Sequence, residues 1–463
     1  MNNKNITHST KTILLFSNLG LFALAWLMFY NHLTFSTHKI EGSIAIIIAY
    51  YLLYSWLCNV YKAFRIASSS LGESIFAQLM SFGVADVVMY LVCCISRHNF
   101  ADLFPIFVTA CMQVIVSIVV CIISKKILMK SIKAEDTLLI AGSILESSDG
   151  EGFVKRLQEK YGYLFSIKEI IDEKEELKAI KLIEECHSII LYDCSETYRK
   201  KYISKSIELE KTLFFTPRIE DILIEGSSTR HLLDTPLLKY DYTFKKGLKL
   251  VLKRLFDILL ALILLVLFSP VMLITAIAIK LEDHGPVLFK QKRYTKDSRI
   301  FEIYKFRSMR VDADKMGVVP TTKGDPRITK VGKFIRAVRI DEFPQLINIL
   351  KGDMSFVGPR PERVEHVDLY SEELPEFKYR LKVRGGLTGY AQVYGKYNTS
   401  PYDKLRLDLL YIENQTLLLD FKLLLLTIKT VITPESTEGF DQEKSNAIQQ
   451  ETSKMKKESY GNE

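Results

Sequence analysis

The stretch LLVLFSPVMLI, residues 264–274, lies at the centre of a long apolar run from Leu255 to Ile279. Proline inside a helix removes a backbone hydrogen bond and clashes with the preceding turn, at a cost of about 3 kcal/mol. Ser269 and Pro270 therefore predict a break in a segment that would otherwise suit a membrane crossing. Each half of the run is too short to cross about 30 Å of hydrocarbon.

Positive charge flanks both ends of this run, whereas a crossing helix usually carries its basic residues mainly on one side. We interpret the segment as a re-entrant hairpin that enters the membrane, breaks at Ser269-Pro270 and returns. The Ser269 hydroxyl would then be a partner for the carbonyl groups that the proline leaves free. The alternative is a fifth crossing helix with a proline kink, and this segment alone does not decide between the two.

Four further apolar stretches come first in the chain, and each approaches the roughly 20 residues that a bilayer crossing needs. They cover about residues 12–30, 42–61, 76–96 and 104–124. Lys and Arg concentrate before the first stretch, between the second and third, and after the fourth, which predicts that these parts are cytoplasmic. The first stretch lacks an obvious signal-peptide cleavage site, which favours an anchor.

The composition narrows the classes of partner. The chain has 463 residues, a net charge of +8 and seven cysteines, none in CxxC spacing. A basic balance beside membrane segments favours an anionic membrane surface or anionic substrates over nucleic acid. The cysteines are interpreted as small buried side chains in a reducing compartment, which argues against a disulfide framework or a zinc site.

The middle of the chain has the pattern of a small soluble α/β unit. The stretches DTLLIAG, HSIILYD and KTLFFTP are typical of strands, and EGFVKRLQEKYG is typical of an amphipathic helix. Strands that alternate with helices predict a parallel, Rossmann-like sheet. The loop after the first strand lacks G-x-G-x-x-G, so a structural or regulatory role is favoured over a nucleotide site.

Asp341 and Glu342 form an adjacent carboxylate pair in what looks like the start of a helix. Neighbours on a helix diverge by about 100°, so one carboxylate could attack an electrophile while the other holds a metal. Alone, the pair is better explained as an acidic first turn favoured by the helix dipole. Cations elsewhere in the same short region favour a metal and phosphate site. They are Lys305, Arg336, Arg339 and Arg360.

Two shorter motifs are more ambiguous. Pro359 and Pro361 restrict the backbone on both sides of Arg360, which suits phosphate or nucleotide binding but equally a rigid surface turn. The sequence DAD at 312–314 matches a metal motif of many glycosyltransferases, and a helix cap is the favoured explanation. The chain contains no P-loop, H-E-x-x-H or G-x-S-x-G motif, and its eight histidines form no cluster.

Residues 250–432 resemble the bacterial polyprenyl-phosphate glycosyl-1-phosphate transferases, which initiate exopolysaccharide, capsule and O-antigen synthesis. The matching stretches are KRLFDI, FSPVM, YKFRSM, GDPRITKVGKFIR, DEFPQLINILKGDMSFVGPRPE and GLTGYAQVYG. The four preceding spans and the Rossmann-like region resemble the large subclass of this family. The resemblance therefore covers nearly the whole chain.

The resemblance implies transfer of a sugar-1-phosphate, with a hexose as the first expectation, from a UDP-sugar to undecaprenyl phosphate, with release of UMP. It implies a Mg²⁺ cofactor, a covalent phosphosugar on Asp341 and a metal-associated Glu342. The remaining expected substrate-binding residues are Lys305, Arg336, Pro359, Arg360, Pro361 and Arg384. The active site would lie on the cytoplasmic face of the bacterial inner membrane, and a homodimer is left open.

One motif departs from the family. The usual R-P-G-[IL]-T-G-W reads Arg384-Gly385-Gly386-Leu387-Thr388-Gly389-Tyr390. Glycine in place of proline is expected to loosen a loop, and tyrosine in place of tryptophan shrinks an aromatic surface. This departure bears on nucleotide or sugar preference.

The expected fold is a mostly α membrane protein with four parts. Residues 1–134 form four transmembrane helices, 135–243 a Rossmann-like α/β domain, 244–434 a re-entrant helix with an α+β catalytic domain, and 435–463 a disordered tail. Two rival functions remain. One is a membrane-anchored sensor or scaffold without catalysis, and the other is a glycosyltransferase that acts through DAD and releases UDP.

Overall fold

A computed structural model describes residues 3–30, 39–66, 69–97, 99–131, 134–142, 148–232, 235–240, 247–311, 325–395 and 400–432. The chain forms two compact units, Met1–Thr216 and Pro217–Glu463. Each is described by itself. The DAD motif at 312–314 and the tail at 435–463 lie outside the described residues.

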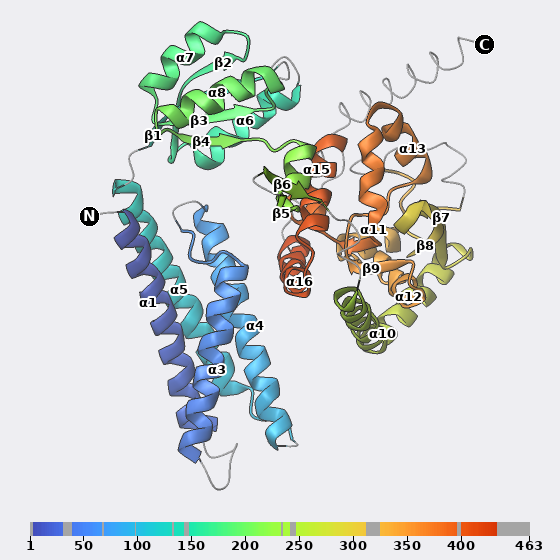
Figure 1. Ribbon diagram of the computed structural model, residues 1–463. Helices are drawn as coiled ribbons and strands as arrows, with labels where there is room; N and C mark the ends of the chain where they lie inside the picture. The colour runs from blue at the N-terminus through green and yellow to red at the C-terminus, as the bar shows by residue number, and fades with distance from the viewer. Residues whose placement is uncertain are drawn as a thin grey trace, which may run out of the picture. The chain divides into compact units, whose positions relative to one another are not determined.

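The first unit begins with long apolar helices that coincide with the four predicted stretches. Four of them are long and apolar enough to cross a membrane by length and composition. Figure 1 shows them side by side as a bundle, and their crossing of the bilayer stays a prediction. They are α1 (Asn3–Ala25) with its π-helical continuation η1 (Trp26–Tyr30), α3 (Lys39–Val60), α4 (Leu71–Arg97) and α5 (Phe104–Ser131).

Buried polar side chains join these helices. The Asn18 amide donates to the Tyr54 hydroxyl at 2.9 Å, and that hydroxyl donates to Gln78 Oε1 at 2.8 Å. The Gln113 amide donates to the Tyr50 hydroxyl at 2.9 Å. In an apolar surrounding such groups need partners, so these contacts select one packing of the helices.

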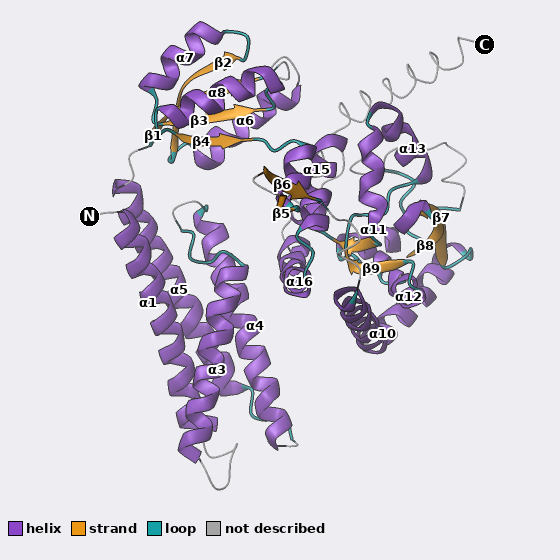
Figure 2. Ribbon diagram, viewed as in Figure 1, coloured by secondary structure: helices purple, strands orange, loops and turns teal. Residues whose placement is uncertain are grey.

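The rest of the first unit is the predicted parallel sheet, and this prediction is confirmed. Its strand order is β2-β1-β3-β4, with every pair parallel. The strands are β1 (Glu135–Ala141), β2 (Phe165–Asp172), β3 (Ser188–Tyr192) and β4 (Thr212–Phe215), and the helices are α6 (Ser148–Tyr161), α7 (Glu176–Glu185) and α8 (Glu196–Glu208). Leu138 packs with residues of α7 and α8, whereas Leu139 packs with residues of α6. Helices therefore cover both faces of the sheet (Figure 2).

The second unit combines short strands with helices around one core. β7 and β8 are antiparallel, as are β5 and β6, whereas β9 and β10 are parallel. The strands are β5 (Ser228–Leu232), β6 (Thr235–Lys239), β7 (Leu288–Tyr294), β8 (Ile300–Phe306), β9 (Met354–Val357) and β10 (Gly385–Thr388). The α-helices are α9 (Ile219–Glu225), α10 (Leu248–Asp283), α11 (Lys330–Ala337), α12 (Gln345–Lys351), α13 (Val364–Glu373), α14 (Tyr390–Tyr394), α15 (Pro401–Glu413) and α16 (Leu417–Ile432). Three 3₁₀ turns are η4 (Lys296–Ser298), η6 (Ile340–Glu342) and η7 (Pro375–Lys382).

The division between the units comes earlier in the chain than the sequence suggested. The sequence pattern predicts a middle domain over residues 135–243, but Ile219 and Ile222 of α9 belong to the core of the second unit together with Leu405 and Leu409 of α15. No change of composition near α9 marks this boundary in the sequence. The residues that α9 packs against lie almost 200 residues downstream.

Helix α10 corrects the expected break at Ser269-Pro270. The helix is uninterrupted from Leu248 to Asp283, with Pro270 inside it. Proline cannot donate to the carbonyl four residues earlier, and the Ser269 hydroxyl donates to that same Val266 carbonyl at 2.8 Å. The predicted partner role of Ser269 is confirmed. It explains why the chain stays helical where a break was expected.

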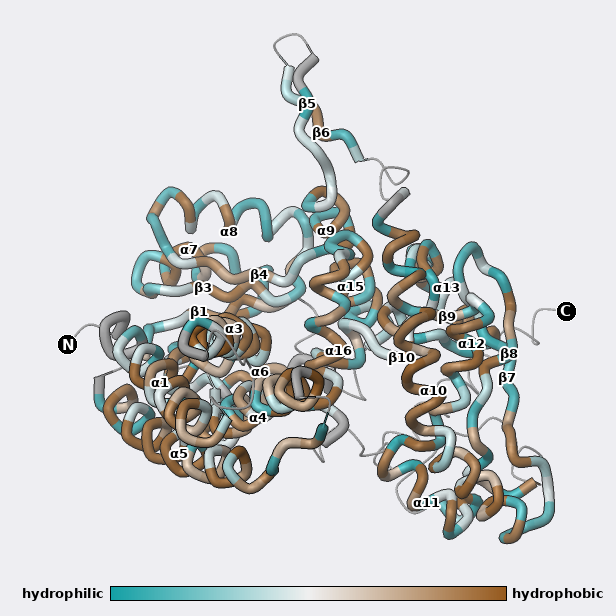
Figure 3. Tube along the Cα trace, turned by 90° about the horizontal axis from the view of Figure 1, so that it is seen from below, coloured by the Kyte–Doolittle hydropathy of each residue, from teal (hydrophilic) through white to brown (hydrophobic). Residues whose placement is uncertain are grey.

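Both ends of α10 contact other elements of the second unit (Figure 3). Near its N-terminus, Lys253 Nζ lies 2.6 Å from Asp420 Oδ2. Near its C-terminus, Asp283 pairs with Arg307. The opposite face carries exposed apolar side chains, which include Leu259, Leu262, Ile263, Val266, Ile274 and Leu281. The helix therefore has one face on the protein and one face suited to lipid.

Candidate active site

The carboxylate pair lies on the 3₁₀ turn η6, between α11 and α12, rather than in the first turn of a helix. Arg339 adopts a left-handed conformation with φ of 60°, which ends α11 and redirects the chain. Buried Ile335 and Leu346 anchor the two flanking helices. The turn therefore presents Asp341 and Glu342 from a supported position.

Glu342 is held between cations from distant parts of the unit. Its Oε1 accepts from Arg360 Nη2 at 2.8 Å and from Lys305 Nζ at 3.3 Å, and Arg339 Nη1 lies 4.0 Å away. Burial alone would raise the pKa of Glu342, but Arg360 and Lys305 hold it well below its ordinary value. The surrounding cations therefore favour the ionised form of Glu342.

Asp341 has a different environment from its neighbour. Its Oδ1 is buried and has no hydrogen-bond partner among the residues that the structure describes. Burial and the charge of Glu342 raise the pKa of Asp341, against the opposing effect of Lys305, Arg336 and Arg339. A carboxylate oxygen without hydrogen bonds is more basic, so it is suited to attack an electrophile or to bind a hard cation.

The two cations that donate to Glu342, Lys305 and Arg360, come from separate elements. Lys305 lies near the end of β8, paired in register with Phe289 of β7. Burial lowers the pKa of Lys305, and Glu342 opposes that effect. Arg360 follows β9, and the charge of Glu342 raises the pKa of its guanidinium. These groups form an ion-paired cluster that the sequence motifs predicted in composition but not in connectivity.

The other predicted residues lie at different positions around this cluster. Arg336, in the last turn of α11, acts electrostatically on Asp341. The carbonyl of Pro359 accepts from Gly386 N at 2.8 Å. By contrast, Arg384 Nε donates to the Gly352 carbonyl at 3.0 Å, which supports the chain after α12. It has no contact with Glu342 among the described residues, so its binding role stays a prediction.

The departure at Gly385 has a packing explanation. Gly385 starts β10 and pairs with Met354 of β9, so this segment is a strand and not a loosened loop. A Cβ at Gly385 would lie 2.4 Å from Pro361 Cγ. Glycine therefore permits close packing against the Pro359–Pro361 segment. Tyr390 begins α14, with its ring centroid 5.1 Å from that of Tyr394.

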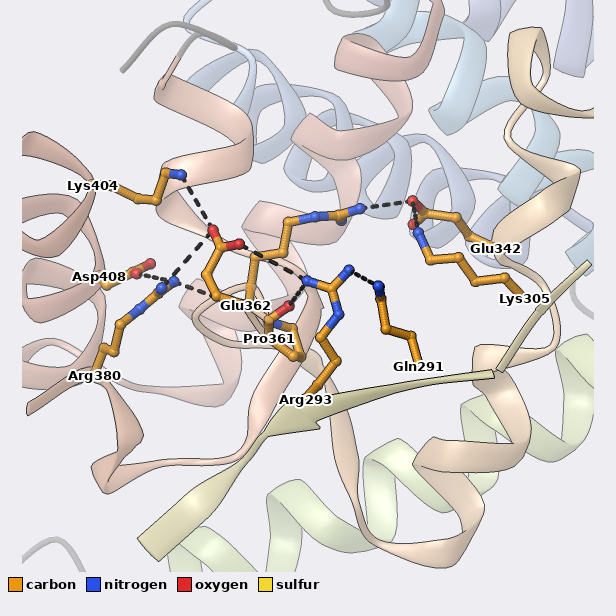
Figure 4. A network of polar contacts seen from close by, with 10 residues as sticks. Gln291, Arg293, Lys305, Glu342, Pro361, Glu362, Arg380, Lys404 and Asp408 are labelled. Atoms are coloured by element: carbon orange, nitrogen blue, oxygen red, sulfur yellow. Dashed lines mark hydrogen bonds and ion pairs between the residues drawn. The ribbon is translucent and has the colours of Figure 1, made fainter. Parts of the chain in front are cut away.

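Sequence reasoning missed a set of charged residues behind Arg360. Figure 4 shows Glu362 between Lys404 and Arg293, with Asp408 beside Arg380. Their measured contacts include Lys404 Nζ to Glu362 Oε1 at 3.2 Å and Arg380 Nη2 to Asp408 Oδ2 at 2.7 Å. The only sequence signal was Glu362 at the end of the GPRPE stretch, because the partners come from three other elements.

The donor set is compatible with a divalent cation. No group of three or more His, Cys, Asp or Glu side chains gathers as a metal cage within the described residues. Magnesium, however, is usually held by one or two carboxylates together with substrate phosphates. The unpartnered Asp341 Oδ1 beside the ionised Glu342 meets that requirement.

Most of the second unit is similar to known proteins. Residues 248–434 match the model of the bacterial sugar transferase family. The chain is 49% identical over 185 residues to a UDP-N-acetylgalactosamine-undecaprenyl-phosphate N-acetylgalactosaminephosphotransferase of Aeromonas hydrophila, covering 39% of this chain and 44% of that protein. It is 36% identical over 245 residues to a UDP-glucose:undecaprenyl-phosphate glucose-1-phosphate transferase of Klebsiella pneumoniae, covering 52% of this chain and 53% of that protein.

The match thus spans about half the length of these two relatives. A shorter relative is covered almost completely. The chain is 42% identical over 195 residues to an exopolysaccharide production protein PSS of Rhizobium leguminosarum bv. phaseoli, covering 40% of this chain and 96% of that protein. The matched region contains the whole cluster around Asp341 and Glu342. This chain therefore belongs to the bacterial sugar transferase family.

Proposed function

We propose that this protein transfers a sugar-1-phosphate from a UDP-sugar to undecaprenyl phosphate and releases UMP. The observation that carries the proposal is the pair formed by Asp341, with its buried and unpartnered Oδ1, and the cation-bound Glu342. The names of the Aeromonas and Klebsiella relatives support the reaction class.

In the first half-reaction, Asp341 Oδ1 attacks the β-phosphorus of the UDP-sugar. A bond forms between this oxygen and phosphorus, and the bond from the β-phosphorus to the oxygen that bridges to the α-phosphate breaks. The bonding electrons leave with UMP. The absence of hydrogen bonds to Oδ1 among the described residues leaves its lone pairs available for this attack.

In the second half-reaction, an oxygen of undecaprenyl phosphate attacks the same phosphorus. The bond between phosphorus and Asp341 breaks, which restores the carboxylate and forms undecaprenyl-diphosphate sugar. The chemistry therefore needs the nucleophile to meet a water-soluble donor and a lipid-borne acceptor in turn.

The charged side chains around the pair support both steps. Lys305 and Arg360 are placed to stabilise phosphate oxygens, since phosphoryl transfer depends mainly on positioning and charge stabilisation. Glu342 holds these two cations in place. Together with Asp341, Glu342 would hold a magnesium ion, which supplies neutralisation of the diphosphate charge when bound.

The contacts of α10 support an active site at the membrane surface. Arg254 near its N-terminus donates to the Ile349 carbonyl at 2.6 Å, and Glu282 near its C-terminus accepts from Lys330 N at 2.8 Å. At its middle, the rings of Phe268 and Phe343 are 4.7 Å apart. Because both ends and the middle of this uninterrupted helix contact one polar unit, we infer that both ends lie on the same side of the membrane and that the helix lies at the membrane surface. The active site would thus face the cytoplasm, where UDP-sugars are, at the inner membrane.

The proposed donor is a UDP-hexose, and an N-acetylhexosamine donor is the second candidate because of the Aeromonas relative. The purified protein is incubated with undecaprenyl phosphate, Mg²⁺ and one UDP-sugar from a set with glucose, galactose or N-acetylgalactosamine. We expect UMP with one of them. Release of UDP would instead indicate an ordinary glycosyltransferase, and no nucleotide product with any donor would favour a sensor or scaffold.

The covalent step is tested by omitting the lipid acceptor. The protein with UDP-sugar alone should release UMP in a burst limited to the amount of protein, and a peptide that contains Asp341 should gain the mass of a sugar phosphate. UMP release that requires the acceptor from the start would contradict the covalent step while leaving the overall transfer intact.

A further inference from the structure

We propose that the buried ion network of Arg293, Glu362, Arg380 and Asp408 positions Arg360, and that Arg380 is a positioning residue for the proposed transfer. This inference rests on the proposed function and adds residues that touch neither Asp341 nor Glu342 in the described contacts. It concerns the backbone that carries Arg360.

Two guanidinium groups hold consecutive carbonyls of that backbone. Arg380 Nη2 donates to the Arg360 carbonyl at 3.0 Å, and Arg293 Nη1 donates to the Pro361 carbonyl at 3.1 Å. The prolines on both sides of Arg360 already restrict their own φ angles. The two hydrogen bonds fix the remaining freedom of the peptide groups.

The two guanidinium groups lie beside buried carboxylates, and Arg293 Nη2 also donates to Gln291 Oε1 at 2.6 Å. The side chains of Arg380 and Asp408 are each only 1% exposed and lie 2.7 Å apart. Glu362 lies 3.9 Å from Arg293 Nη1 and 3.9 Å from Arg380 Nη1, and it also pairs with Lys404 (Figure 4). The network therefore joins elements β7, η7 and α15 to the chain after β9.

A buried ion pair is seldom the most stable way to fill a core, since desolvation cancels much of the attraction. In this protein the ion network contributes by holding the backbone of Arg360 in one position. The Arg360 guanidinium reaches Glu342 at 2.8 Å, and phosphoryl transfer is sensitive to displacements of about 1 Å in the charges that surround it. A network that fixes the backbone of Arg360 therefore fixes the distance between the site cations and the carboxylate pair.

Within the network the Glu362–Arg293 pair favours its charged form near neutral pH, whereas burial raises the pKa of Asp408 to about 6 against the opposing charges of Arg380 and Lys404. Although burial raises it, the pKa of Glu362 is held at about 2 by Lys404, Arg380 and Arg293. Burial lowers the pKa of Arg293 to about 10, against the opposing charge of Glu362. Both members of this pair remain ionised in the range where the transfer is measured.

The test is a double-mutant cycle between Arg360→Lys and Arg380→Lys, with the rate of UMP release as the readout. Arg380→Lys keeps the charge opposite Asp408 but loses the fork that also reaches the Arg360 carbonyl. It should lower the rate about tenfold in the wild-type background and less than about twofold further in the Arg360→Lys background. A purely structural role would lower the rate by the same factor in both backgrounds.

Asp420→Asn is the matched control, because it breaks another buried ion pair of the same unit. Its partner Lys253 donates to the Val357 carbonyl and not to Arg360 or Pro361. Its effect should be the same with and without Arg360→Lys. Melting temperatures of all variants in the same detergent identify any loss caused by unfolding. Arg293→Lys, which releases the Pro361 carbonyl, replaces Arg380→Lys if that variant does not fold.

The outcomes of these measurements distinguish the positioning role of Arg380 from the proposed transfer itself. Equal losses in both backgrounds, or no loss from Arg380→Lys, would overturn the positioning role while leaving the transfer itself established by the wild-type rate. A wild-type protein that releases no UMP with any donor would overturn the proposed function, and the positioning role with it.

Discussion

The parallel sheet of the first unit and the carboxylate turn η6 of the second differ in whether their polar groups have hydrogen-bond partners. At the carboxyl ends of the sheet strands, Glu173 Oε2 accepts from Ser195 N at 2.6 Å, and Thr216 Oγ1 accepts from Asp193 N at 2.8 Å. In the second unit, Asp341 Oδ1 is buried without a partner among the described residues.

This difference between the two regions bears on where a ligand site would lie. Ligands of open parallel sheets usually bind outside the carboxyl ends of the strands, near helix N-termini. Here Glu173, a carboxylate of the chain itself, occupies the N-terminus of α8. The regular fold satisfies these groups internally, whereas the less regular unit keeps a carboxylate oxygen of Asp341 without a partner among the described residues. A nucleotide-like fold is thus no guide to the location of the reaction.

The largest expected effect is at Asp341. Asp341→Asn keeps the shape of the side chain but removes the charge that attacks phosphorus, so UMP release should fall at least about 10³-fold. The measurement is the initial rate of UMP release by purified protein. Glu173→Gln, the corresponding change in the parallel sheet, should leave that rate within about twofold. A similar fall in both variants would erase the contrast between the two regions.

Lys305 should rank second. Lys305→Met removes one of the cations that hold Glu342 and face the substrate phosphates, with an expected loss of about 10²-fold in the same rate. Lys290→Met is the matched control on the adjacent strand β7, where Lys290 pairs with Glu302 and both side chains are about half exposed. An equal loss in both variants would attribute the effect to general surface charge.

A pH dependence of stability should distinguish the second unit. The pKa of Glu362 is lowered from 4.5 to about 2 in the folded protein. A lowered folded-state pKa contributes stability that is present above about pH 4.5 and lost as pH falls toward about 2. The contribution is up to about 3 kcal/mol. Melting temperatures of wild type and Glu362→Gln should therefore converge on acidification, and parallel curves would contradict the ion network as a stabilised ionised state.

The smallest effect is expected from Glu173→Ala. Loss of the carboxylate leaves Ser195 N at the start of α8 without its side-chain acceptor, which should cost about 1 kcal/mol of unfolding free energy. Thermal unfolding measures this cost, and UMP release should remain unchanged. A gain of nucleotide binding by the variant would show that Glu173 blocks a functional phosphate site and would revise the comparison.

Much of the architecture follows from local pattern. The apolar stretches predicted the four N-terminal helices, and the alternation of strand-like and helix-like segments predicted the parallel sheet. Local hydrophobic periodicity is sufficient to predict these helices and strands, because each is formed by one continuous stretch of chain. Residue identity likewise predicted that Lys305 and Arg360 belong to one charged region with Asp341 and Glu342, but it did not predict that both cations contact Glu342.

Other features depended on contacts that no local pattern contains. A break is predicted at Pro270, but α10 continues through it, and the Ser269 hydroxyl donates to the Val266 carbonyl that the proline leaves free. Gly385 was expected to loosen a loop, but Pro361 packs where its Cβ would lie.

The amino-acid sequence by itself determined which segments are apolar, which form the parallel sheet and which carboxylates and cations are candidates for the site. Only the tertiary structure decided that Asp341 keeps an oxygen without a partner among the described residues while the charge of Glu342 is paired with Arg360 and Lys305. It also decided that Arg380, which pairs with Asp408, donates to the backbone carbonyl of Arg360. The physical reason is that burial and pairing set the energy of a charge. Both are properties of neighbours that the folded chain brings together from distant positions.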